Sequence, residues 1–458
     1  MLDRFYLMSN RYERVLNTIP WTDPIIRSIF SGISRVTRLS YKAVNQHHQV
    51  IWNTAANVIA PLYVSFVWWL LQQAKAAGIR RLYFMARDGL ILKEIADILV
   101  PACGLDIETR YIYVSRQSLL YPSIINVDAF DVRWLTWNPL TDLSMRTILQ
   151  RLGISSNLIE KELKNYEIED ISRSLSLVEK WRLRKFFLEP RIKSLILERT
   201  QARYETAILY LKQEGLADGN PFALVDLGWA ALSQYAISRM LDKAGCRPAQ
   251  GLRGYYLGTN WLLWKYRNDT AESFLFNPSN LIRQMPLVQY ELPEIFAVLD
   301  HGRTLGYEIQ NNHAVPILSK PNTTAKEWGS DIQRSGVLTF AKEIVAVMPK
   351  HHWQKKSPSA RIAKIFDLFC NRPSREEAET YGSFLHGADM EEKNPQEISP
   401  RVGLGSFFKT LKGYYWVQGS VIRSKWICPS LIVNVFVLLN VVRHGVIWFV
   451  DSLFYKRP

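Results

Sequence analysis

The chain has 458 residues, of which 48% are hydrophobic and 22% are charged. This is the composition of a globular protein with two or three hydrophobic cores, and it excludes a disordered or fibrous chain. Lysine and arginine outnumber aspartate and glutamate by 57 to 42, and the net charge of +15 predicts a polyanionic partner: nucleic acid, an anionic membrane or a phosphorylated substrate. The four cysteines are far apart, which argues against a disulfide framework or a structural zinc site and favours a reducing compartment.

The first segment, residues 1–45, carries seven arginines or lysines and three acidic residues scattered among aromatic ones. We expect it to form a basic helical arm. Its start lacks the uninterrupted apolar core of a signal peptide, so we expect the protein to be cytoplasmic.

Residues 46–118 are expected to be the first part of an α/β core. Apolar residues recur at helical spacing from Ile51 to Ala77, and Gly78 is placed as a C-cap. The run RRLYFMA then predicts a strand buried on both faces, GLILKEIADIL a helix, and ETRYIYVSR a second, parallel strand.

Polar helical patterns follow over residues 119–215, which we interpret as a helical insertion or cap. The strand–loop–helix pattern returns at PFALVDLGWAALSQYAISRML, and LRGYYLG predicts a further strand, so residues 216–320 form the second part of the core. The predicted fold class is therefore α/β: an open, mainly parallel sheet with a helical insertion and helical N- and C-terminal regions.

Residues 321–425 are expected to be helical, and residues 426–458 to form an amphipathic or membrane-interface helix. The apolar core from Leu431 to Val442 is shorter than the roughly 20 residues that span a bilayer. From Arg401 onward eight basic residues accompany one acidic residue, which favours an anionic membrane surface. The alternative is a helix packed on the core or on a partner subunit.

Two loops leave the predicted sheet at the carboxyl ends of their strands, ARDG at 86–89 and DLGW at 226–229. Ligands of open α/β sheets bind at that edge, where helix N-termini and arginines attract anions and aspartates bind hydroxyls or transfer protons. Carboxylates there also bind metal ions, so Mg²⁺ is an open option. The candidate catalytic residues are Asp88 and Asp226, and the candidate ligand-binding residues are Arg87, Gly89, Ser115, Arg116, Gly228, Trp229 and Glu294.

A structural alternative explains the same residues without a ligand. Asp88 and Asp226 would be helix N-caps, and Arg87 and Arg116 would form ion pairs with them. For each residue alone this alternative carries about as much weight as function, whereas the set on one edge favours function.

The chain also resembles a known family at these positions. The likeness rests, in order, on IRRLYFMARDGLIL, RYIYVSRQSL, ALVDLGW, GYYLG, ELPEIFAVLDHGRTLGYE and WVQGSVIRS. These motifs are similar to bacterial predicted hydrolases of the haloacid dehalogenase-like superfamily, which are associated with glycosyltransferases in surface-polysaccharide loci. The superfamily's D-x-D motif is missing, because Leu90 and Gly228 stand two residues after Asp88 and Asp226. The chain therefore resembles the companion, C-terminal domain of that family, and phosphatase chemistry is not expected.

The resemblance implies a role in surface-polysaccharide biosynthesis (lipopolysaccharide or capsule), with a glycosyltransferase as partner. Two classes of function stay open. The first is a hydrolase or transferase that acts on a phosphorylated sugar, nucleotide sugar or lipid-linked glycan, with Asp88 or Asp226 as acid or base. The second is a non-catalytic scaffold that holds a glycosyltransferase at the membrane.

Nucleic acid is not expected as a partner, because basic and aromatic residues form no recognisable binding module. The expected location is cytoplasmic and peripheral to the inner membrane.

Overall fold

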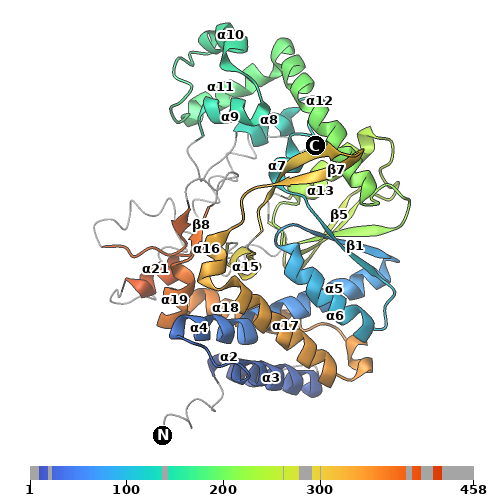
Figure 1. Cartoon of the computed structure of the whole chain (residues 1–458), viewed down its shortest axis with the longest axis vertical. Helices are drawn as coiled ribbons and strands as arrows, with labels where there is room; N and C mark the ends of the chain where they lie inside the picture. Colours follow the sequence, from blue (N-terminus) through green and yellow to red (C-terminus); the bar gives the residue numbers. More distant parts are fainter. Residues whose placement is uncertain are drawn as a thin grey trace.

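The protein is built around a five-stranded, all-parallel sheet, as a computed structural model of the chain shows (Figure 1). The structure describes residues 10–18, 23–136, 143–260, 263–277, 291–299, 301–387, 395–403 and 416–424. The strands are β1 (Arg81–Met85), β2 (Glu108–Ile112), β3 (Phe222–Asp226), β4 (Arg253–Gly258) and β5 (Thr270–Phe276), in the order β2-β1-β3-β4-β5. The predicted α/β class is confirmed.

This strand order creates a switch point between β1 and β3. From β1 the chain passes to β2 on one side, and it later returns to β3 on the other side. The loops that follow β1 and β3 therefore leave the sheet in opposite directions and open a space at its carboxyl edge, where ligands of such sheets bind.

Helices cover both faces of the sheet. Alternate side chains of each strand point to opposite faces, so Leu82 and Phe84 pack in one core and Tyr83 and Met85 in the other. The first core is closed by α5 (Ala60–Ala76), α6 (Gly89–Ala102) and α17 (Ser330–Val347), and the second by α7 (Arg116–Leu120), α12 (Pro190–Gln213) and α13 (Leu232–Lys243). Burial on both faces explains why β1 is apolar almost throughout.

The helix expected before β1 is longer than the sequence pattern suggested. It runs through α4 (Gln46–Thr54), a π-helical turn (Ala55–Ile59) and α5, and Gly78 follows it at φ +68°. Within the described part of the chain, Gln46–Ala76 is the one helical run that is long and apolar enough to cross a membrane, but 94% of its most apolar window is buried inside the protein. The run has the burial of a core helix.

The segment expected to form a basic arm is helical, but it does not extend away from the molecule. Its helices α2 (Arg11–Thr18) and α3 (Pro24–Leu39) pack beneath the sheet helices. Leu16 and Phe30 are fully buried, and Glu13 accepts a buried hydrogen bond from Arg38 at 2.6 Å. Apolar residues at helical spacing give both helices a face that is buried against the core.

The helices after α7 form a separate lobe at one end of the molecule (Figure 1). They are α8 (Ala129–Thr136), α9 (Met145–Leu152), a 3₁₀ turn (Ser156–Ile159), α10 (Glu160–Asn165), α11 (Leu177–Leu188) and the first half of α12. The lobe has its own apolar core, which includes Ile148, Phe186 and Ile196. This is the segment that the sequence pattern marked as an insertion.

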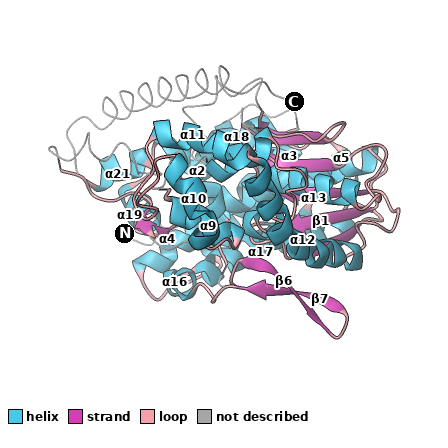
Figure 2. Cartoon of the chain, turned by 90° about the horizontal axis from the view of Figure 1, so that it is seen from above, coloured by secondary structure: helices cyan, strands magenta, loops and turns pink. Residues whose placement is uncertain are grey.

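Two elements of the second half of the core were not expected from the sequence. One is the edge strand β5, and the other is an antiparallel hairpin of β6 (Thr304–Gln310) and β7 (His313–Leu318), which stands apart from the main sheet (Figure 2). The hairpin turns at Asn311 and Asn312, both at positive φ, which asparagine tolerates well. It packs on α12 through Tyr307, which stacks on Tyr210 at 4.5 Å between ring centroids.

The remaining helices join the N-terminal ones at the other end of the molecule (Figure 1). They are α16 (Thr323–Trp328), α17, a 3₁₀ turn (Lys350–Gln354), α18 (Ser359–Asn371), α19 (Arg375–Gly382) and α21 (Val417–Arg423), with the short strands β8 (Leu385–His386) and β9 (Gln396–Glu397). The membrane-interface helix expected over residues 426–458 lies outside the described residues.

A buried ion pair fixes the insertion to the core. Arg239 of α13 donates to both carboxylate oxygens of Asp131 of α8, at 2.7 and 3.2 Å, and both side chains are almost fully buried. Arg239→Ala should lower the free energy of unfolding by about 3–5 kcal/mol, because it leaves a buried carboxylate without its partner. Arg267→Ala, which breaks the exposed pair with Asp242, should lower it by less than about 1 kcal/mol. Urea denaturation of both variants measures the difference, and equal losses would contradict this role of Arg239.

Candidate functional site at the carboxyl edge of the sheet

The loops after β1 and β3 lie side by side at the switch point. Phe84 of β1 is in register with Val225 of β3. Arg87 and Asp88 follow β1, and Asp226 is the last residue of β3. The peptide bonds Ala86–Arg87 and Gly228–Trp229, one in each loop, are cis. Residues more than a hundred positions apart in the sequence thus meet at one edge.

Asp226 is the carboxyl group whose protonation is most clearly altered. Burial raises its pKa well above the ordinary value, and the charges of Asp88 and Glu294 raise it further. The N–H of Leu227, which donates to Asp226 Oδ1 at 2.9 Å, and the positive charge of Arg116 act in the opposite direction. The residue as a whole is partly exposed at the edge of the sheet. Asp226 therefore holds its proton more tightly than an ordinary aspartate does.

The structure does not support helix capping by the two aspartates. Asp88 precedes α6 but has helical backbone angles (φ −61°, ψ −28°), and its side chain does not bind the N-terminus of that helix. A capping aspartate has an extended backbone, from which its oxygen reaches the free N–H groups. Asp226 is separated from α13 by a loop, and Ala231 holds the cap position there. Capping therefore does not explain why these positions carry aspartate.

Arg116 opens α7 at the carboxyl end of β2 and has an exposed side chain. In the described ranges it forms no ion pair, so the alternative of a structural ion pair fails for this residue. Arg87 is partly buried. Its positive charge opposes the rise that burial causes in the pKa of Tyr111. The edge thus presents two arginines beside a cluster of carboxyl groups.

Ser115 has a structural role. It is the N-cap of α7 and forms a capping box with Ser118. Its hydroxyl also donates to the carbonyl of Thr304 in the hairpin at 2.6 Å. The prediction that Ser115 binds ligand is not supported, because these contacts already occupy its hydroxyl; serine is a preferred N-cap residue for the same reason.

The two glycines have packing roles. A Cβ at Gly89 would lie 2.8 Å from the carbonyl carbon of Phe84, and one at Gly228 would lie 2.2 Å from the carbonyl oxygen of Gly258. Gly228 also has φ +145°, which other residues rarely adopt. Both glycines therefore allow the loops to pack closely on the sheet, whether or not a ligand approaches them.

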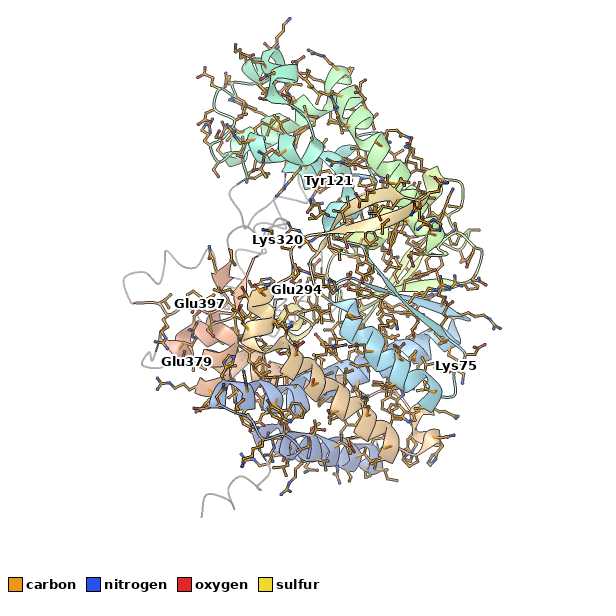
Figure 3. All side chains as sticks on the ribbon, viewed as in Figure 1. Lys75, Tyr121, Glu294, Lys320, Glu379 and Glu397 are labelled. Atoms are coloured by element: carbon orange, nitrogen blue, oxygen red, sulfur yellow. The ribbon has the colours of Figure 1, made fainter. Side chains whose placement is uncertain are left out.

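Trp229 and Glu294, two of the candidate ligand-binding residues, are in direct contact. Glu294 lies on α15 (Glu291–Phe296), in the middle of the molecule (Figure 3). Trp229 Nε1 donates to Glu294 Oε1 at 3.0 Å, and the indole ring stacks on Phe276. Glu294 Oε2 lies 3.7 Å from His386 Nε2 of β8. Glu294 thus connects the loop after β3 with the C-terminal helical region.

Tyr111 and His301 belong to the same edge, although the sequence did not identify them as a pair. Tyr111 Oη lies 2.7 Å from His301 Nε2, and His301 Nδ1 lies 2.9 Å from the carbonyl oxygen of Gly302. A carbonyl oxygen only accepts, so Nδ1 carries the proton and Nε2 accepts from Tyr111. Burial raises the pKa of Tyr111, and the charges of Tyr113 and Asp88 add to this effect. The residues are 190 positions apart, and no local signal joins them.

Mg²⁺ at the carboxyl edge stays a prediction. Among the described residues, no three His, Cys, Asp or Glu side chains are grouped closely enough to hold a metal ion. A cavity of about 400 Å³, lined by Gly78, Leu216 and Gly251 among others, lies at the opposite, amino end of the strands.

Comparison of the chain with protein-family models and with curated proteins found no match. The family resemblance stays a prediction, and the geometry of the sheet edge carries the functional interpretation.

The raised pKa of Asp226 predicts how stability depends on pH. The folded protein binds this proton more tightly than the unfolded chain does, so the contribution of Asp226 to stability is greatest below about pH 4 and declines as pH rises toward the raised pKa. Asparagine does not titrate, so Asp226→Asn removes the loss of stability that the wild type shows as pH rises. The variant should gain stability relative to the wild type between pH 4 and pH 7, as urea denaturation at several pH values measures.

Asp218 is a control of opposite sign. Burial alone would raise its pKa, but hydrogen bonds from Arg81 and Asn220 outweigh that effect and hold the pKa at about 2. Asp218→Asn should therefore destabilise the protein at pH 7, with a loss that fades as pH falls from about 4 toward 2. The same pH trend in both variants would contradict the raised pKa of Asp226.

Proposed function

We propose that the protein is an enzyme of surface-polysaccharide biosynthesis that binds a phosphorylated sugar, a nucleotide sugar or a lipid-linked glycan at the carboxyl edge of its sheet. The observation that carries this proposal is the position of Asp226 at the switch point, where it interacts with Asp88 and where burial raises its carboxyl pKa well above the ordinary value. A carboxyl group with a raised pKa is suited to donate a proton at neutral pH.

Two carboxyl groups in different environments suit a group transfer or a hydrolysis. In the proposed reaction, Asp226 gives its proton to the oxygen of the leaving group. Asp88 accepts the proton of the attacking hydroxyl, which belongs to water or to an acceptor sugar. After the products leave, Asp88 gives its proton to solvent and Asp226 takes one up, so the protein returns to its starting state and no proton is gained or lost overall. Burial, and after it the charge of Asp88, raises the pKa of Asp226, which supports unequal roles for the pair.

The arginines supply the contacts to an anionic group. Arg116 is exposed at the start of α7, and Arg87 is on the adjacent loop. A guanidinium group binds phosphate through two parallel hydrogen bonds, which fixes the orientation as well as the charge of the ligand. Trp229, held by Glu294, presents a partly exposed aromatic ring for the apolar face of a sugar.

The polysaccharide pathway is proposed from the resemblance of the motifs in the two loops, α15 and the hairpin. The same resemblance supports a glycosyltransferase as partner.

Turnover by purified full-length protein tests the enzymatic proposal. Sugar 1-phosphates and nucleotide sugars are offered with and without acceptor glycans, and phosphorus NMR follows the products. Asp226→Asn should lower kcat by roughly 10²- to 10⁴-fold, because an amide cannot donate an acidic proton. Asp106→Asn, which alters a fully exposed carboxylate far from the edge, should keep the wild-type rate. An Asp226→Asn variant with full activity would contradict the proposed acid.

We also propose that the protein attaches peripherally to the cytoplasmic face of the inner membrane. The proposal rests on the apolar stretch and the basic residues of the C-terminal sequence. Deleting residues 426–458 should move the protein from sedimenting anionic vesicles to the supernatant, and high salt should partly release the intact protein. Continued sedimentation of the truncated protein would show that this segment is not the anchor.

A further inference from the structure

A second cavity, of about 270 Å³, lies where the insertion meets the hairpin. Side chains from α7, α9, α12, β6 and β7 line it, and Tyr121, at the foot of the insertion, is one of them (Figure 3). The residues at its wall are Gln117, Ser118, Tyr121, Pro122, Gln150, Arg151, Arg203, Thr206, Leu305, Gly306, Tyr307 and Ile317. The reaction proposed above uses none of them.

The charge of this wall is of one sign. Arg151 and Arg203 contribute two positive charges, and the wall contains no aspartate or glutamate. Cations that converge on a concave surface focus a positive potential there and attract anions. The wall of the cavity therefore attracts anions and repels cations.

The guanidinium group of Arg203 is held in place by its neighbours. Arg203 Nη1 donates to the carbonyl oxygen of Arg151 at 2.7 Å, and the guanidinium carbon lies 5.5 Å from the centre of the Tyr121 ring. The first contact joins α12 to the C-terminal turn of α9, and it holds the guanidinium group of Arg203 beside the backbone of Arg151. A positioned guanidinium loses less side-chain freedom when it binds an anion than a free one does.

The rest of the wall suits a hydroxylated ligand. Gln117, Gln150 and Thr206 provide amide and hydroxyl groups, and Tyr121 and Tyr307 provide aromatic surface. Polar groups among aromatic residues are typical of small-molecule sites. The volume is near the lower end of such sites, which matches one sugar ring with its substituent.

We propose that this cavity binds a monosaccharide unit that carries an anionic group, with Arg151 and Arg203 on the anion. The anion is a phosphate or a sugar carboxylate, which share this chemistry. The site is distinct from the carboxyl edge, and the inference holds whether or not catalysis takes place there.

Calorimetric titration of the full-length protein tests the site with three probes: glucose 1-phosphate, glucuronate and neutral glucose. The wild type should bind at least one anionic probe and not glucose, and the better of the two identifies the anion. The double variant Arg151→Gln/Arg203→Gln should lose at least about tenfold in affinity for that probe, because charge-assisted hydrogen bonds are lost. Arg199→Gln, an exposed arginine of the same helix outside the cavity, should leave the affinity unchanged.

The double variant changes Arg151 of α9 and could disturb the packing of that helix. A second variant therefore fills the cavity and leaves its charge unchanged. A Cβ at Gly306 would meet no atom within 4 Å, so Gly306→Leu fits the strand and fills the space. It should remove the component of probe binding that the double variant weakens, keep any binding at the carboxyl edge, and leave the thermal midpoint close to that of the wild type. Arg116→Gln should weaken only binding at the carboxyl edge and keep the component that Gly306→Leu removes, which separates the two sites.

Three outcomes would overturn the proposal. They are absence of binding of both anionic probes at millimolar concentration, equal binding of glucose, or unchanged affinity in the double variant and in Gly306→Leu. If turnover at the edge fails while the cavity binds its probe, only the proposed enzymatic function is refuted.

Discussion

The pairing of β1 with β3 is the contact on which the rest of the molecule depends. It joins segments separated by the whole insertion and creates the switch point of the sheet. Arg81, at the amino end of β1, reinforces it: its guanidinium binds Glu108 of β2 at 2.5 Å and Asp218, just before β3, at 2.6 Å. Because the two strands end together, their loops are forced to share one edge.

That shared edge collects carboxyl groups in a way that stability alone does not favour. Burial raises the pKa of Asp226, and the negative charges of Asp88 and Glu294 raise it further. Like charges brought together at a partly buried site cost folding free energy unless a proton, an arginine or a ligand compensates them. Such arrangements occur at functional sites, where an altered pKa is useful.

The C-terminal helical region and the hairpin contact this edge from different directions. From the C-terminal region, Glu294 and His386 reach the loop after β3 through Trp229. From the hairpin, His301 reaches β2 through Tyr111, and Thr304 binds Ser115 at the start of α7. The hairpin also forms one wall of the cavity below the insertion. A movement of the hairpin would therefore change contacts both at the carboxyl edge and in the cavity.

Periodic hydrophobicity determined the parts of the fold that depend on local pattern. The buried strand RLYFM, the helix after it and the strand FALVD are recognisable because burial on both faces demands continuous apolar side chains. These elements gave the class of the fold. They also placed two loops at strand ends, ARDG and DLGW, each with an aspartate and a glycine. The edge strand β5 escaped notice because four of its seven residues are only partly buried and its pattern is mixed.

Tertiary structure decided what depends on contacts between distant segments. Ser115 fits an anion site in sequence, yet the structure uses it as an N-cap. The basic residues before position 45 suggest a free arm, whereas Leu16 and Phe30 anchor their helices in the core. Tyr111 and His301, Trp229 and Glu294, and Arg151 and Arg203 each become partners only in the folded chain. Local sequence sets the backbone of each element through propensity and periodicity, but the approach of two side chains is set by the packing of whole elements against each other.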